Sequence, residues 1–167
     1  MTSTYEKIAT NTLGSAASSF SFTSIPSTYT DLVLVVSALG TAAVDYIKVN
    51  INSDTGSNYS NTALWGDGSS ALSGRVSNQT FGYLTYTPSF STTSPNALIV
   101  NLQNYSNATT YKTYLSRNNT QVASSGPDAI VGLWRSTSAI TSLTIARTGG
   151  GNFNTGSIIT IYGIKAE

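Results

Sequence analysis

The side chains with acid, base or nucleophilic chemistry are few and widely spaced. The 167 residues include no histidine and no cysteine, which removes the usual general base, the Ser-His pair, cysteine nucleophiles and the commonest zinc ligands. A glycosidase needs two carboxylates facing each other across a cleft, but most of the acids flank predicted strands or lie in turns, where Asp caps backbone donors. The sequence therefore predicts no catalytic residue and no enzyme. The carboxylates are Glu6, Asp31, Asp45, Asp54, Asp67, Asp128 and Glu167.

Two loops have spacings that partly suit ion or phosphate binding. Oxygen-bearing side chains alternate through residues 50–56 as in a calcium loop, but Gly56 comes one place late and Asn61 stands where a bidentate Glu is expected. The run Gly149-Gly150-Gly151 is followed by neither Lys-Ser/Thr nor a helix, so we predict a hairpin tip there and no phosphate loop. We expect no metal and no cofactor, with calcium in the first loop as the open alternative.

Aromatic side chains form the third group with binding chemistry. Two groups of rings could stack on pyranose sugars: Trp65 with Tyr59, and Tyr83 and Tyr86 with Phe90. The alternative is that such rings tile a packed interface between subunits. Both interpretations, a glycan platform and a protein interface, stay open.

Charge is sparse and balanced. Eight Lys and Arg residues oppose seven Asp and Glu residues, for a net charge of +1, and only 9% of the chain is charged. No basic block forms a phosphate-binding face, so nucleic acid is not an expected partner. The first residues are polar and no apolar run approaches the roughly 18 residues of a membrane span, so we expect neither a secretion signal nor a membrane partner.

The elements that must position these residues are predicted to be strands. Asp31–Gly40 holds the longest apolar run, and its Val and Leu content is typical of a strand buried on both faces. Ala17–Thr23 alternates instead, with Phe20 and Phe22 on one face. We expect Asn58–Asn78 to be a long surface excursion, with room for a short strand or one helical turn. Further strands are predicted at Tyr5–Thr12, Val44–Ile51, Thr80–Thr87, Ala97–Leu102, Thr110–Ser116, Ala129–Arg135, Ile140–Arg147 and Ser157–Lys165.

These elements predict an all-β fold. About ten short strands with turn signals between them, and no convincing amphipathic helix, are typical of a β-sandwich. The length suits a single domain over residues 1–167. We therefore predict a single-domain, jelly-roll-like β-sandwich.

Five phrases of the sequence stand in an order and spacing that match a known kind of protein. They are Ser24–Leu34, Asp54–Tyr59, Asn104–Thr113, Gly132–Leu143 and Gly156–Ala166. Together they span nearly the whole chain and resemble the small β-sandwich virion proteins of tailed bacteriophages.

The resemblance implies a structural role in the virion. One implied role is a decoration (cement) protein on the outer surface of the head, with the major capsid protein and copies of itself, as a homotrimer, for partners. The other is a tail or fibre domain that recognises host surface carbohydrate. A fibre tip usually follows a shaft of repeats, whereas the first predicted strand begins at about Tyr5, so we expect the decoration protein. The resemblance supplies no catalytic residues.

Overall fold

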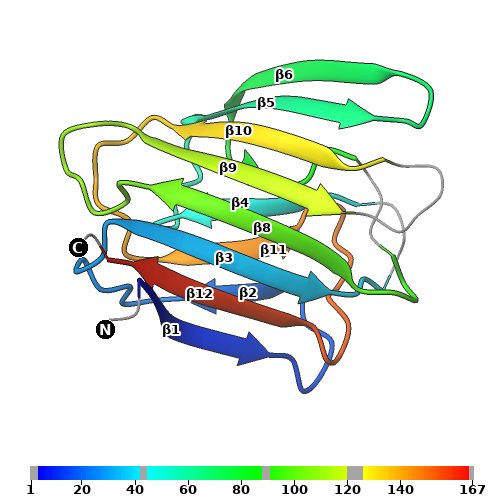
Figure 1. Cartoon of the computed structure of the whole chain (residues 1–167), viewed down its shortest axis with the longest axis horizontal. Helices are drawn as coiled ribbons and strands as arrows, with labels where there is room; N and C mark the ends of the chain where they lie inside the picture. Colours follow the sequence, from blue (N-terminus) through cyan, green and yellow to red (C-terminus); the bar gives the residue numbers. More distant parts are fainter. Residues whose placement is uncertain (1–3, 42–44, 88–90, 120–125, 166–167) are drawn as a thin grey trace.

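Two antiparallel β-sheets stacked on one another make up the protein (Figure 1). The computed structural model describes residues 4–41, 45–87, 91–119 and 126–165. These residues form twelve strands and no helix, so the predicted all-β sandwich is confirmed, with more strands than expected. The finer, jelly-roll-like topology stays a prediction. No helix in the described ranges has the length and apolar character needed to cross a membrane.

The large sheet contains eight strands and the small sheet four, in the orders β1-β12-β3-β8-β9-β10-β5-β6 and β2-β11-β4-β7. The strands of the large sheet are β1 (Tyr5–Thr12), β12 (Ile158–Ile164), β3 (Asp31–Ala38), β8 (Asn96–Gln103), β9 (Lys112–Asn119), β10 (Asp128–Trp134), β5 (Tyr59–Gly66) and β6 (Ala71–Gln79). Those of the small sheet are β2 (Ser19–Phe22), β11 (Leu143–Arg147), β4 (Ile47–Ile51) and β7 (Gly82–Tyr83). Because the large sheet has twice as many strands, it extends past the small one, and β5 and β6 form its upper end in Figure 1.

The core lies between the sheets, where alternate residues of each strand point inward. On β4, Ile47, Val49 and Ile51 are buried while the residues between them are half-exposed. Phe20 and Phe22 of β2 are both buried, so the face predicted from their spacing is confirmed. A period of two is what a pleated strand with one wet face requires.

The segment predicted to be a surface excursion is a hairpin. β5 and β6 pair along their length, and the turn between them is closed by Asp67, whose Oδ1 accepts hydrogen bonds from the backbone amides of Ser69 (2.9 Å) and Ser70 (2.7 Å). Gly68 has a φ of 90°, which suits glycine. The expected loop was wrong, because this short turn leaves enough chain on both sides to pair.

The predicted strand Thr80–Thr87 contributes only the two residues of β7 to a sheet. The backbone amides of Tyr86 and Thr87 donate to the Asp128 carboxylate at 2.7 and 2.9 Å. A side chain therefore takes the donors that a longer strand would give to its neighbour.

Strand β3 is buried along its inner face and only in part along its outer face. Leu32, Leu34 and Val36 point into the core. On the outer face Val33 is buried, at 6% exposed, whereas Val35 is 41% exposed. The prediction of a strand buried on both faces is therefore wrong at Val35, where the described part of the chain leaves the outer side of the large sheet open.

Candidate functional site

Five aromatic rings meet at the end of the sandwich where the large sheet extends past the small one. Trp65 of β5 lies 4.9 Å from Tyr86, and Tyr86 lies 6.1 Å from Tyr83, between ring centroids. Tyr46 joins them at 5.6 Å from Tyr83, and Phe81 at 5.0 Å from Tyr83. All five are half-buried. We call Tyr46, Trp65, Phe81, Tyr83 and Tyr86 the aromatic cluster.

The structure brings together three of the five aromatic residues predicted from the sequence. Tyr59 is fully buried, donates its hydroxyl to the Asp54 carbonyl (3.1 Å) and accepts from the Ile51 amide (3.0 Å). Burial raises the pKa of Tyr59 to about 12. Tyr59 is therefore part of the core and no part of an exposed platform. Phe90 lies outside the described residues.

The backbone of β6 at Gly74 packs closely against two rings of the aromatic cluster and holds them in place. A Cβ on Gly74 of β6 would lie 2.9 Å from the Tyr86 hydroxyl and 3.3 Å from the Trp65 ring. At the other end, Lys48 Nζ lies 5.0 Å from the centroid of the Phe81 ring, within reach of a cation–π attraction. Half-exposed rings with a cation at the rim suit stacking against a sugar or an apolar protein group. Sequence reasoning missed Tyr46, although the alternation of β4 places it with Lys48 on the outward side.

The carboxylates of the described residues are engaged in structural contacts. Asp45 is buried with Arg147, at 3.4 Å from Oδ2 to Nε, and accepts from the Gly149 amide (2.5 Å) and the Thr148 hydroxyl. Burial raises the pKa of Asp45, but the hydrogen bonds from Thr148 and Gly149 and the charge of Arg147 outweigh it, and the pKa is lowered. Asp45 therefore joins the start of β4 to the loop after β11.

Asp54 has a similar structural role in the loop of residues 50–56, whose spacing resembles that of a calcium loop. Its Oδ2 accepts from the indole Nε1 of Trp134 (2.7 Å) and from Asn58 Nδ2 (2.9 Å), and its Oδ1 from the Gly56 amide (2.8 Å). Within the described ranges, no three residues of the His, Cys, Asp and Glu types group together in a way that could hold a metal ion. The other described acids also accept hydrogen bonds: Glu6 from Lys165 and Tyr29, Asp31 from the Asn104 amide, Asp67 within its turn and Asp128 from Tyr86 and Thr87. Glu167 lies outside the described residues.

The outward side of the large sheet, here called the outer face, carries exposed apolar side chains. Register places Val131 of β10 beside Leu115 of β9, and Ile99 of β8 beside Val35 of β3. Arg117 of β9 stands between Ile99 and Ala129, which is followed by Leu64 of β5. Exposed large apolar residues that lie in a continuous patch mark interaction surfaces in soluble proteins. Six aliphatic residues of this kind, between 37% and 61% exposed, belong to the outer face: Val35, Leu64, Ile99, Leu115, Val131 and Ile158.

The outer face has the size of a protein–protein interface. Eight strands about 4.8 Å apart and seven to nine residues long, at about 3.3 Å each, span roughly 38 by 25 Å, or about 950 Å². A typical stable interface buries about 800 Å² per partner. One copy of this sheet can therefore supply one side of such an interface.

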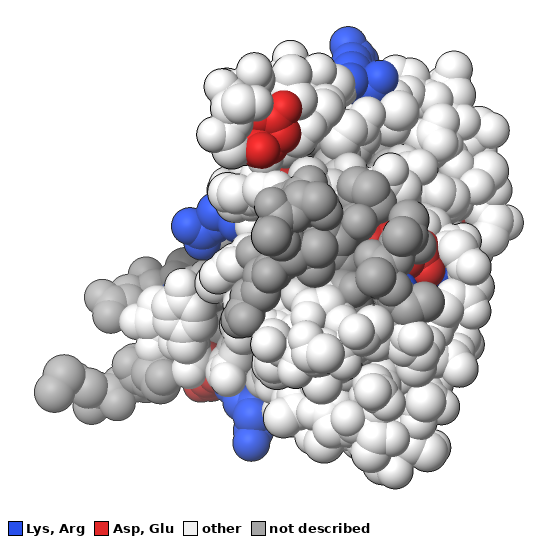
Figure 2. Space-filling model, turned by 90° about the vertical axis from the view of Figure 1, so that its right-hand side faces the viewer, with Lys and Arg blue, Asp and Glu red and all other residues white. Residues whose placement is uncertain are grey.

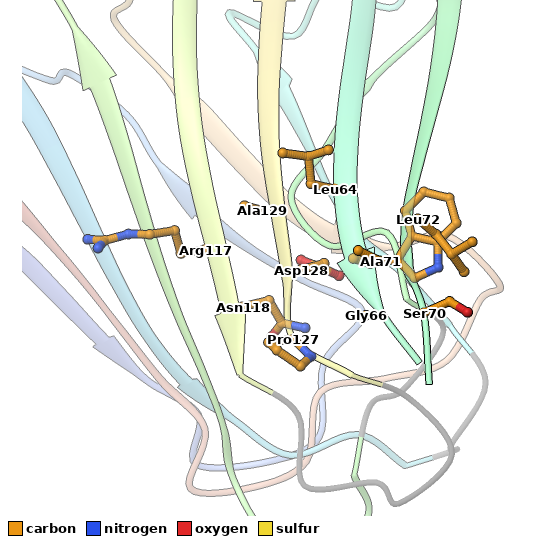
Figure 3. A pocket seen from close by; sticks show the side chains of 11 residues that line it. Leu64, Gly66, Ser70, Ala71, Leu72, Arg117, Asn118, Pro127, Asp128 and Ala129 are labelled. Carbon is orange, nitrogen blue, oxygen red and sulfur yellow. The ribbon is translucent and has the colours of Figure 1, made fainter. Parts of the chain in front are cut away.

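A hollow of about 580 Å³ lies where β5, β6, β9 and β10 end (Figure 3). Leu64, Trp65, Leu72 and Pro127 give it a mainly apolar wall, and Arg117 lines it from β9. A second hollow of about 230 Å³ lies on the other side of Arg117, against Ala97 and Ile99 of β8. The two hollows extend the outer face at one end of the sheet.

Charged groups are sparse on the side of the molecule that Figure 2 shows. A few basic and acidic side chains are separated there by wide uncharged areas. A surface of this kind lacks the charge density that keeps neighbouring proteins apart, so it tolerates close packing.

No protein-family model matches this chain, and no curated protein matches it in sequence.

Proposed function

We propose that the protein is a structural component of a tailed-bacteriophage virion, a decoration protein that binds the outer surface of the head lattice through its outer face. The observation that carries the proposal is the set of exposed aliphatic side chains on the outer face, which includes the adjacent pairs Val131–Leu115 and Ile99–Val35. A solvent-facing sheet of a free monomer usually alternates apolar-in with polar-out. Apolar residues on both sides indicate that a partner covers the second side.

The acids of the chain agree with a role without catalysis. Each described carboxylate accepts hydrogen bonds from its own fold, as Asp45 does from Gly149 and Asp54 from Trp134. A general acid or base must instead reach a substrate. The order and spacing of the phrases that resemble phage virion proteins supports the same role, as does the low charge. Trimers suit the threefold positions of a capsid lattice.

The test is binding to heads assembled without the protein, by co-sedimentation. Val131 is 57% exposed in the middle of the outer face, so Val131→Lys should leave the fold intact and weaken binding at least about tenfold. Thr144→Lys on β11 of the small sheet is the matched control and should bind as the wild type does. Equal binding by Val131→Lys would contradict docking through this face.

A second candidate, recognition of host surface carbohydrate by a tail or fibre domain, is favoured by the aromatic cluster. In that case Val131→Lys should be harmless, and Trp65→Ala should abolish retention on the host polysaccharide. Because Trp65 also packs on Tyr86 at 4.9 Å, its variant must first show a cooperative unfolding transition. Retention that depends on Trp65, together with no binding to heads, would replace the decoration role.

A further inference from the structure

Three basic side chains have no partner within the part of the chain that the structure describes. Of the eight Lys and Arg residues, Arg147 and Lys165 form ion pairs with Asp45 and Glu6. Lys112 donates to two backbone carbonyls, Arg135 donates to Ser57 and Asn78, and Lys48 lies over Phe81. The three that remain are Lys7, Arg75 and Arg117.

All three unpartnered cations lie on the outer face. Lys7 of β1 pairs with Tyr162, and Arg117 of β9 pairs with Ile99, both on the outward side of the sheet. Arg75 of β6 pairs with Thr62, which itself pairs with the exposed Val131. Chance alone would distribute unpartnered cations over all sides of the molecule.

The outer face has little acidity to balance these charges. Asp31 of β3, opposite the outward-facing Ile164, is on this side, and its Oδ1 already accepts a hydrogen bond from the Asn104 amide at 2.6 Å. Glu6 is on the inward side, where Lys165 and Tyr29 hold it. The outer face is therefore apolar with a positive excess.

The arrangement of the cations in the sheet fixes their spacing. Lys7, Arg117 and Arg75 stand on the first, fifth and eighth strands of the large sheet. At about 4.8 Å per strand, Lys7 and Arg117 are roughly 19 Å apart across the sheet, and Arg117 and Arg75 roughly 14 Å. Groups fixed on paired strands keep such a spacing.

Arg117 stands between the two hollows of the outer face. The larger hollow has Leu64 and Ala129 on one side of it, and the smaller has Ala97 and Ile99 on the other. Figure 3 shows the Arg117 side chain extending sideways from β9, away from Leu64. A guanidinium with apolar hollows on both sides suits a carboxylate flanked by apolar side chains.

We infer that the surface which the outer face covers is apolar and acidic, with a carboxylate that pairs with Arg117 and further carboxylates opposite Lys7 and Arg75. The identity of that surface as the head lattice rests on the proposed function. A second copy of this chain, stacked outer face to outer face, does not fit this description. Each copy would present three cations to the other, with only Asp31, which already accepts a hydrogen bond, to balance them. The apolar side chains next to the partner's central carboxylate fill the hollows beside Arg117.

The experiment measures binding to heads assembled without the protein as a function of salt. Arg117→Glu should bind at least about tenfold more weakly than the wild type, because it places like charges together in the interface. Thr144→Glu on β11 of the small sheet lowers the net charge by one unit away from the outer face, as Arg117→Gln does on it, and should bind normally. Wild-type binding should weaken as salt rises, and the slope should be smaller for Arg117→Gln.

Each result separates this inference from the proposed function. If the wild type binds heads and Arg117→Glu binds equally well, the acidic partner surface is refuted while the decoration role stands. If the wild type does not bind heads, both are refuted. Binding of the wild type, but not of Arg117→Glu, to vesicles of anionic lipid in place of heads would show that the cations serve a membrane, and would overturn the inference.

Discussion

Asp128 is a buried carboxyl group with one satisfied oxygen and one unsatisfied oxygen. Its Oδ2 accepts from the Tyr86 and Thr87 amides and from the Thr87 hydroxyl at 2.7 to 2.9 Å. Its Oδ1 has no donor, and neither has Oδ1 of Asn118, which stands opposite on β9. Burial raises the pKa of Asp128. The pKa is raised although the Thr87 and Tyr86 amides, the Thr87 hydroxyl and the Asn118 side chain all favour the carboxylate, so burial is the dominant effect.

We predict that Asp128→Asn is tolerated and that Asp128→Ala is not. Asn keeps an acceptor for the Tyr86 and Thr87 amides and carries no buried charge, so the free energy of unfolding at pH 7 should stay within about 1 kcal/mol of wild type. Asp128→Ala leaves buried amides without an acceptor and should cost about 3 kcal/mol or more. Urea unfolding measures both. Equal losses in the two variants would contradict this interpretation.

The same residue predicts a pH dependence. Because the pKa of Asp128 is raised in the folded state, the folded protein binds the proton more tightly than the unfolded chain does. The contribution of Asp128 to stability is therefore full below the unfolded pKa of about 3.9, and it is lost as pH rises through the folded pKa. As pH rises through that window, the wild type should lose stability relative to Asp128→Asn. Above the window, the difference in the free energy of unfolding between the two proteins should be constant.

At the scale of elements, Tyr114 joins the two sheets across β10. Its ring lies over Gly132 of β10, where an added Cβ would come within 1.9 Å of ring Cζ. Its hydroxyl donates to Asn61 Oδ1 on β5 at 2.5 Å and lies 3.0 Å from the Tyr83 carbonyl on β7. Burial raises the pKa of Tyr114, so the hydroxyl stays a donor. The position of β7 relative to the large sheet depends on this ring.

We predict that Gly132→Ala is strongly destabilising. The added methyl group must displace the Tyr114 ring from its contacts, at a cost of at least about 2 kcal/mol in the free energy of unfolding. Gly14→Ala is the matched control, because a Cβ at Gly14 meets nothing within 4 Å. Thermal and urea unfolding of the pair should differ by that amount. A Gly132→Ala protein as stable as Gly14→Ala would show that Tyr114 is free to move.

The alternation of apolar and polar residues predicted well which side chains of a strand face the core. It predicted poorly which strands pair with one another. Phe20 and Phe22 could be assigned to the core because alternation alone decides which side they face. Asp67-Gly68 was a hairpin signal that could have predicted β5 and β6, since Asp caps the turn and Gly supplies the positive φ.

The candidate site shows why the rest needed the three-dimensional structure. Tyr59 and Trp65 face the same side of β5, yet Tyr59 binds β4 at Ile51 and is buried, whereas Trp65 packs on Tyr86 in the half-exposed cluster. The sequence carries no mark of where the small sheet ends. Similarly, the apolar run of β3 gave no sign that Val35 on its outer side is exposed.

At the scale of the whole molecule, charge and apolarity are divided between the two sides of the large sheet. The inner side holds the core, and Glu6 with Lys165 closes its edge at 2.6 Å. The outer side holds exposed apolar residues such as Leu64 and Val131, together with the unpartnered cations such as Arg117. A rigid face that is repeated on many copies can bind a lattice firmly even when each contact is weak.

Cryo-electron microscopy of the intact virion tests the central claim most directly. The proposal predicts sandwich-shaped density in icosahedral register over the head, with the large sheet turned toward the shell and Val131 and Arg117 in the contact. Density on the head with the outer face turned to solvent would contradict docking through this surface. A few copies at the tail, and none on the head, would contradict the decoration role and make Trp65 and its neighbouring tyrosines the residues to test.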